Sequence, residues 1–342
     1  MIKRKLRRAL LTLLSVYERY RPAFLRRISA DRLVFLLSQS SNYQGVQDNI
    51  NGLIKQHLPG LSYIQVTRPE YGQYVGLQGL SFSLFIRDQS DVLMSHGVAD
   101  KNYFFIKDES GRRLVNRRKH LLVPGPWLKQ RLLNSKHIEL TADQIHCVGW
   151  PRLDVLLEMQ ADHDQSKAVR PLNSERKPKV LWAPTHDKRR RGADGRSTSS
   201  YPELERYEDY FREHFDFEVA LHPRNRKDKK PTAEKLVEAD YVISDFGTMV
   251  YEAWALGKPV VFPSWLIGDL IQQHLRGSAE AHIFKHRIGL HAQSPEDIVD
   301  MISSGAGIGD DVKAFMEDYL PSEFNGKSSR RVATLLQDLN RA

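Results

Sequence analysis

The segment from Ala239 to Phe262 constrains the fold more than any other part of the chain. Its pattern predicts a short buried strand at Tyr241–Ile243, a polar turn, a helix over Thr248–Leu256 and a second strand at Val260–Phe262. A strand, helix and strand in this order form a right-handed crossover between parallel strands. The free N–H groups of the helix N-terminus then lie at the carboxyl end of a strand, where open α/β sheets bind phosphate groups.

The same alternation extends over most of the chain. Apolar runs typical of strands recur, for example at Leu33–Leu37, Asp91–Met94 and Val180–Ala183, with helical stretches between them. The polar stretch Met159–Pro178 has no clear period and is the best candidate for a linker. We therefore predict an α/β protein of two Rossmann-like domains, with parallel sheets facing a central cleft.

The basic charge of the chain is concentrated at its beginning. Residues 1–30 hold nine Lys or Arg and one Glu, a net +8 of the chain's +9, so the remainder carries only +1. Leu6, Leu10, Leu13, Leu14 and Tyr17 fall on one helical face of this segment. That pattern favours a helix on an anionic membrane surface, with a helix packed on the protein itself as the alternative. The near-neutral remainder argues against a nucleic-acid partner.

Candidate functional side chains follow the ends of predicted strands. His96 stands beside Gly97 after one strand, with Lys101 close behind, and imidazole can accept a proton from a hydroxyl near neutral pH. His222 and Arg224 follow another strand and can donate hydrogen bonds to phosphate oxygens. A histidine or a basic loop at such a place is also compatible with a purely structural role.

The turn that precedes the predicted helix at Thr248 supplies a second group of candidates. The group comprises Ser244, Asp245, Gly247 and Thr248, which would hold phosphate, and Glu252, which would take the ribose hydroxyls. Thr185 and Arg152 stand in two weaker turn motifs. The single cysteine, Cys147, excludes a disulfide within the chain, and no zinc-binding motif is present. We therefore expect no metal and no cofactor.

Taken in order, these turns resemble those of the CDP-glycerol glycerophosphotransferases, which include teichoic-acid primases and polymerases and related capsule enzymes. The resemblance runs from about residue 31 to residue 330. The motifs that carry it are His96-Gly97 with Lys101, Gly149-x-Pro151-Arg152-x-Asp154, Ala183-Pro184-Thr185, His222-Pro223, Ser244-Asp245, Leu256-Gly257-Lys258-Pro259 and Gly326-Lys327-x-Ser329.

The resemblance implies a GT-B-like fold and a peripheral position on the cytoplasmic face of the cell membrane. It implies an enzyme that moves glycerol phosphate from CDP-glycerol to a hydroxyl of a lipid-linked, capsular or cell-wall acceptor and releases CMP. His96 and His222 would be its important histidines. The expected divisions are a membrane-associating helix (1–30), an acceptor domain (31–165), a donor domain (170–310) and a helical segment that crosses back (311–342).

Two other functions remain open from the sequence. Gly247 and Glu252 also resemble features of GT-B glycosyltransferases, which use a nucleotide sugar for cell-surface polysaccharide synthesis. The second alternative is a basic lipid- or nucleic-acid-binding protein without catalytic activity. Identification of the released nucleotide would separate the first alternative from glycerol phosphate transfer.

Overall fold

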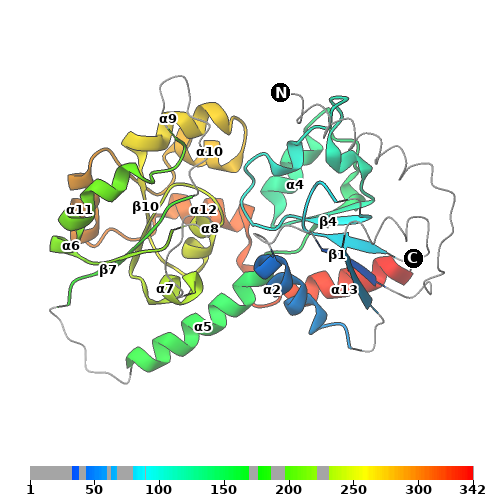
Figure 1. Ribbon diagram of the computed structural model, residues 1–342, viewed down its shortest axis with the longest axis horizontal. Helices are drawn as coiled ribbons and strands as arrows, with labels where there is room; N and C mark the ends of the chain where they lie inside the picture. Colours follow the sequence, from blue (N-terminus) through cyan, green and yellow to red (C-terminus); the bar gives the residue numbers. More distant parts are fainter. Residues whose placement is uncertain are drawn as a thin grey trace, which may run out of the picture.

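A computed structural model describes the chain over residues 33–37, 44–59, 63–67, 80–88, 90–168, 176–185, 197–221 and 231–341. The predicted membrane helix at 1–30, together with His222 and Arg224, lies outside these residues. The predicted fold class is confirmed: the described strands form two parallel sheets in an α/β arrangement (Figure 1).

The first sheet has six strands in the order β2-β1-β3-β4-β5-β6, and every pair in it is parallel. Its strands are β1 (Leu33–Leu37), β2 (Tyr63–Thr67), β3 (Ser81–Ser83), β4 (Val92–Met94), β5 (His120–Val123) and β6 (Ile145–Cys147). The helices of this half are α2 (Gln44–Lys55) and α4 (Pro126–Leu133). Because β6 ends the strand order, one of its sides has no neighbouring strand in the sheet.

The second sheet has five parallel strands in the order β11-β10-β9-β7-β8. They are β7 (Lys179–Ala183), β8 (Asp216–Val219), β9 (Tyr241–Ser244), β10 (Val260–Pro263) and β11 (Leu290–Ala292). The helices of this half are α6 (Glu208–His214), α7 (Thr232–Glu238), α8 (Thr248–Ala255), α9 (Ser264–His274), α10 (Ala279–His286), α11 (Pro295–Ser303) and α12 (Asp310–Tyr319).

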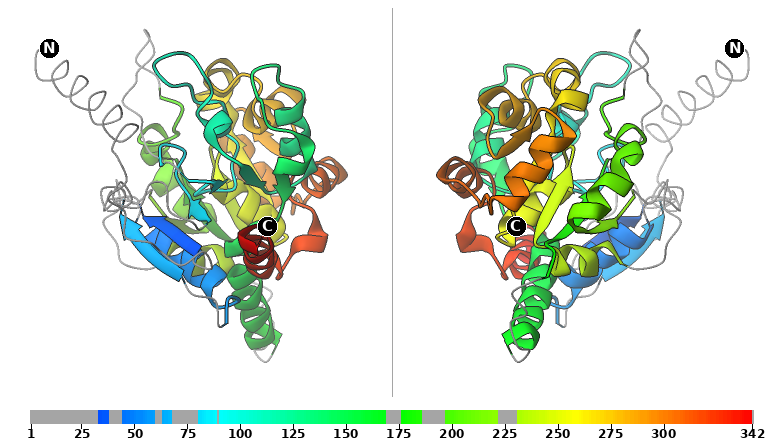
Figure 2. Two further views of the ribbon diagram at one scale, coloured as in Figure 1. Left: turned by 90° about the vertical axis from the view of Figure 1, so that its right-hand side faces the viewer. Right: turned by 90° about the vertical axis from the view of Figure 1, so that its left-hand side faces the viewer.

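The connection between the halves begins with a long helix, α5 (Pro151–Ala168). The prediction of a linker over 159–178 was therefore wrong for its first ten residues, 159–168, which continue the helix. Pro151 opens α5, and neither Gly nor Pro interrupts it before its end. The polar composition that predicted a linker instead belongs to an exposed helix, which extends away from both sheets (Figure 2).

The last helix, α13 (Ser328–Arg341), returns to the first half and lies against α2 and α5 (Figure 1). The carboxylate of Asp154 in α5 accepts hydrogen bonds from the backbone N–H groups of Ser328 (3.1 Å) and Ser329 (2.7 Å). These bonds satisfy two donors at the start of α13 that have no partner within the helix. The two segments that cross between the halves are thereby joined to each other.

The halves also share an apolar core. Trp150 at the end of the first half and Tyr251 in α8 belong to the same buried cluster as Tyr319 at the end of α12. The rings of Tyr251 and Tyr319 stack with their centroids 4.5 Å apart. Within the described residues, no helix is long and apolar enough to cross a membrane.

Candidate active site between the two halves

His96 lies in the turn that follows β4 and is held between two aromatic rings. It stacks on Phe85 with ring centroids 4.9 Å apart and meets the edge of Tyr103 at 5.2 Å. The pKa of His96 is lowered to about 4. Burial is the largest cause, the positive charge of Lys101 acts in the same direction, and a hydrogen bond with the backbone of Leu84 opposes the shift. The imidazole is therefore neutral near pH 7 and able to accept a proton.

The turn at His96 touches the helix that the sequence predicts as a phosphate site. A Cβ atom placed on Gly97 would lie 2.7 Å from Oγ1 of Thr248, the first residue of α8. A side chain at position 97 would therefore require Thr248 to move. Two groups predicted separately, one in each half, are thus neighbours in space.

Lys101 joins these groups from the first half. Its ammonium lies 4.7 Å from the ring centroid of Phe246, and a Cβ atom on Gly247 would come within 2.6 Å of Nζ. Gly247 has a φ of +104° and leads into α8, whose N-terminus receives no side-chain cap. The lysine charge and the helix N-terminus together make this corner of the cleft positive and suited to a phosphate.

Ser244, Asp245 and Thr185 lie behind this corner. The hydroxyl of Ser244 is fully buried and donates to the carbonyl of Ala183 (2.8 Å), while the carboxylate of Asp245, also fully buried, accepts from the N–H of Thr185 (2.8 Å). Burial raises the pKa of Asp245 to about 6, opposed by hydrogen bonds from Ser200, Thr185 and Ser199. In this conformation their polar groups join the turns after β7 and β9 and so position α8, and the prediction that these residues hold phosphate stays a prediction.

Glu252 has a different setting from the one expected for a ribose ligand. Its side chain is 1% exposed, its Oε1 accepts from Nε1 of Trp150 (2.9 Å), and Nε of Arg152 approaches to 3.4 Å. Trp150 and Arg152 belong to the first half and Glu252 to the second. The carboxylate therefore binds the halves to each other in this conformation, and the prediction that it takes the ribose hydroxyls stays a prediction.

Sequence reasoning missed a buried carboxylate pair beside Lys101. Glu280 in α10 accepts from the backbone N–H groups of Asp100 (3.0 Å) and Lys101 (2.8 Å). The carboxylate of Asp100 accepts from the N–H of Ala279 (3.0 Å) and from Arg131. The pKa of Asp100 is raised to about 7. Burial is the largest cause, the negative charge of Glu280 adds to the rise, and the positive charge of Arg131 opposes it. No local pattern reveals this pair, because an acidic residue in the first turn of a helix is ordinary on exposed surfaces.

The described residues contain no group of three or more His, Cys, Asp or Glu side chains placed to hold a metal ion. The contact between the halves offers a neutral imidazole, an ammonium and a helix N-terminus, beside the buried carboxylates of Asp100 and Glu280. This set can take a proton from a hydroxyl and hold a phosphate beside it.

Solved structures show which known proteins share this fold. A solved structure of the wall teichoic acid polymerase TagF aligns with a TM-score of 0.64 and 16% identity, covering 99% of this chain and 98% of the other. A TagF variant soaked with CDPG aligns with a TM-score of 0.62 and 15% identity, covering 99% and 97%. At such identities the alignments show a shared fold.

No protein in the curated set matches the sequence of the chain. The family model for CDP-glycerol:poly(glycerophosphate) glycerophosphotransferase matches residues 92–338, which include the whole contact between the halves. The chain therefore belongs to the CDP-glycerol glycerophosphotransferase family of enzymes.

Proposed function

We propose that this enzyme transfers glycerol phosphate from CDP-glycerol to a hydroxyl of a lipid-linked or cell-wall polymer, and that the reaction takes place where His96 meets α8. One observation carries the proposal: Gly97 and Lys101 of the first half lie directly against Thr248 and Gly247 of the second. A base and a phosphate site must be adjacent for phosphoryl transfer, and we assign them to these two neighbouring turns, one in each half.

In the proposed reaction, the acceptor hydroxyl oxygen attacks the phosphorus that carries glycerol. The hydroxyl proton passes to the neutral imidazole of His96, and the bond from phosphorus to the bridging oxygen breaks, so that CMP leaves with the electron pair. Lys101 and the N–H groups of α8 stabilise the charge on the phosphate oxygens. The first half would carry the acceptor and the second half the donor.

His222 and Arg224 keep their proposed role at the diphosphate on chemical grounds alone. Both side chains donate hydrogen bonds, and the guanidinium offers a planar pair of donors to phosphate oxygens. Replacement of either residue should weaken CDP-glycerol binding.

A panel of donors tests the proposed function. CDP-glycerol, CDP-ribitol, UDP-sugars and GDP-sugars are each supplied with a poly(glycerophosphate) acceptor, and the released nucleotide is identified. We expect CMP release with CDP-glycerol. We also expect Thr248→Val to weaken CDP-glycerol binding in calorimetry while the unfolding midpoint stays unchanged. Release of UDP or GDP alone would identify a glycosyltransferase on the same fold.

We further propose that residues 1–30 attach the enzyme to the cytoplasmic face of the membrane. Their net +8 charge supports this, because each cation close to an anionic bilayer contributes about 1 kcal/mol. The full chain should sediment with anionic liposomes, and a chain that begins at Asp31 should not. Equal sedimentation of the two chains would contradict the proposal.

A further inference from the structure

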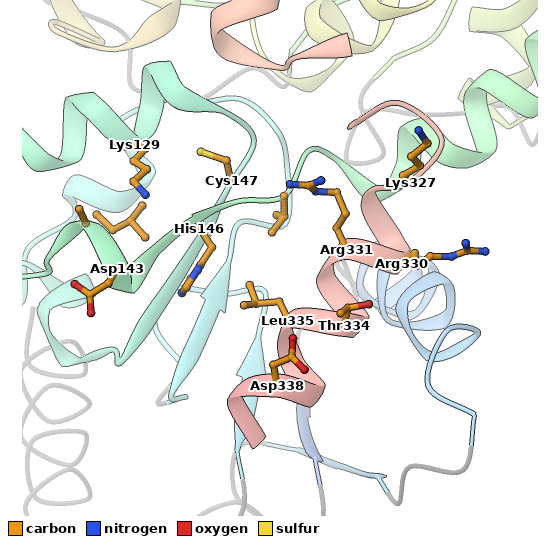
Figure 3. A pocket seen from close by; sticks show the side chains of 13 residues that line it. Lys129, Asp143, His146, Cys147, Lys327, Arg330, Arg331, Thr334, Leu335 and Asp338 are labelled. Atoms are coloured by element: carbon orange, nitrogen blue, oxygen red, sulfur yellow. The ribbon is translucent and has the colours of Figure 1, made fainter. Parts of the chain in front are cut away.

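A cavity of about 720 Å³ lies outside the contact between the halves, in the space between the free side of β6 and α13 (Figure 3). Its volume is in the range of ordinary small-molecule sites. None of the residues that meet around His96 lines it. Ile145, Val148 and Leu335 give it apolar walls, and charged side chains surround them.

One face of α13 supplies most of the charge. Lys327, Arg331, Leu335 and Asp338 recur at helical spacing and line the cavity, whereas Val332, Ala333 and Leu336 are buried in the core. The order along the helix places the cations at its beginning and the acid near its end. Asp143, which precedes β6, also lines the cavity, on the side opposite α13 (Figure 3).

Two cations line the cavity from different elements. Lys129 comes from α4 and Arg331 from α13, and the guanidinium of Arg331 points toward Cys147 (Figure 3). Among the described residues, neither Lys129 nor Arg331 forms an ion pair with a carboxylate. The guanidinium of Arg331 stacks on the ring of Phe324 at 4.2 Å, which limits its freedom before any ligand binds.

We infer that this cavity binds a phosphodiester group of the poly(glycerophosphate) chain. The inference rests on the proposed function and adds a second contact for the acceptor, apart from its reacting hydroxyl. Lys129 and Arg331 would bind the phosphate oxygens, and the apolar walls would contact the glycerol carbons. Asp143 and Asp338 would repel the polyanion, so the cavity holds only a short stretch of it.

The position of the cavity suits an acceptor that reaches His96. The cavity is bordered by Val148, just beyond the carboxyl end of β6, and the turn of His96 follows the carboxyl end of β4. Only β5 separates these two strands, so their axes are about 10 Å apart. A flexible chain of glycerol phosphate units can extend over such a distance while its end hydroxyl lies at His96.

Calorimetry with a soluble oligomer of glycerol phosphate, in the absence of donor, tests the inference directly. Arg331→Gln and Lys129→Gln should each weaken binding about tenfold, the effect of losing one charge-assisted hydrogen bond. Arg341→Gln is the matched control, since it removes the same charge from the end of the same helix, outside the cavity lining, and should leave the affinity within twofold. Thermal unfolding of all three variants checks that they remain folded.

Unchanged affinity in Arg331→Gln and Lys129→Gln would overturn the inference, as would an equal loss in Arg341→Gln, which would indicate nonspecific attraction. A third arm uses vesicles that contain phosphatidylglycerol. If Arg331→Gln weakens binding to the vesicles and not to the oligomer, the cavity holds a lipid headgroup and the inference is wrong. CMP release from CDP-glycerol with a short acceptor is measured separately, so failure of the proposed function is distinguishable.

Discussion

Replacement of Glu280 by alanine tests whether the buried carboxylate pair maintains the active site. The side chain of Glu280 is 1% exposed and accepts hydrogen bonds from the N–H groups of Asp100 and Lys101 and from the hydroxyl of Tyr251 (2.9 Å). Alanine would leave these three donors without their acceptor. At about 1–3 kcal/mol for each, the loss is about 3–9 kcal/mol. That is a large part of the stability of an ordinary domain, about 5–15 kcal/mol.

Glu280→Gln provides the comparison. Its amide oxygen can still accept from Asp100 and Tyr251, but its NH₂ group would face the N–H of Lys101, so we expect a loss of only about 1–3 kcal/mol. Urea unfolding measures both losses. Because Lys101 lies against the start of α8, turnover should also fall more in the alanine variant.

The pH dependence gives an independent check. Asp100 has a raised pKa, about 7 against 3.8, so its protonated form stabilises the fold fully below pH 4 and that contribution is lost as the pH rises through 7. Glutamine at position 280 removes a negative charge that raises this pKa, so the variant loses less stability between pH 5 and pH 8. The cost of Glu280→Gln should therefore be smaller at pH 8 than at pH 5. Equal costs for alanine and glutamine, or a cost that is independent of pH, would refute the reasoning.

Other residues give predictions of the same kind. His96→Ala should lower turnover by about a hundredfold or more with little change in donor affinity. Because the pKa of His96 is about 4, the acid limb of the wild-type kcat/KM profile should lie near pH 4. An acid limb at pH 6.5 or above would exclude His96 as the base. Gly97→Ala should lower kcat/KM several-fold, since the new methyl group would meet Thr248. A crystal structure of the variant should show α8 displaced. Full activity with α8 in its original position would contradict the contact. Burial raises the pKa of the Cys147 thiol and Arg331 lowers it, so Arg331→Gln should slow alkylation of this single cysteine at pH 8, measured by mass spectrometry; faster alkylation would contradict the assignment.

The strand ends could be predicted from the sequence because parallel strands carry their polar turns to one edge of a sheet. His96 and Thr248 were predicted on that basis, and the structure brings them together although more than 150 residues separate them. The three-residue strands β3 and β11 were missed, since Ser-Phe-Ser and Leu-His-Ala are too short to show a period.

The roles of buried polar residues could not be predicted in the same way. Asp245 was predicted to bind a ligand because it follows a strand, and Glu252 because it lies in the helix that comes next. Their hydrogen-bond partners, Thr185 and Trp150, come from distant segments. Tertiary contacts decide whether such a carboxylate faces a ligand or its own protein. A single sequence does not contain that information.

The two crossings between the halves have a mechanical consequence. The chain passes through α5 and again through the segment before α13, and Asp154 fastens the second passage to the first. With two passages fastened side by side, any rotation of one half against the other that stretches neither passage is confined to one axis. Admission of a donor and departure of CMP would then swing α8 along a single arc relative to His96. The position of α8 relative to His96 would then be the same each time the two halves close.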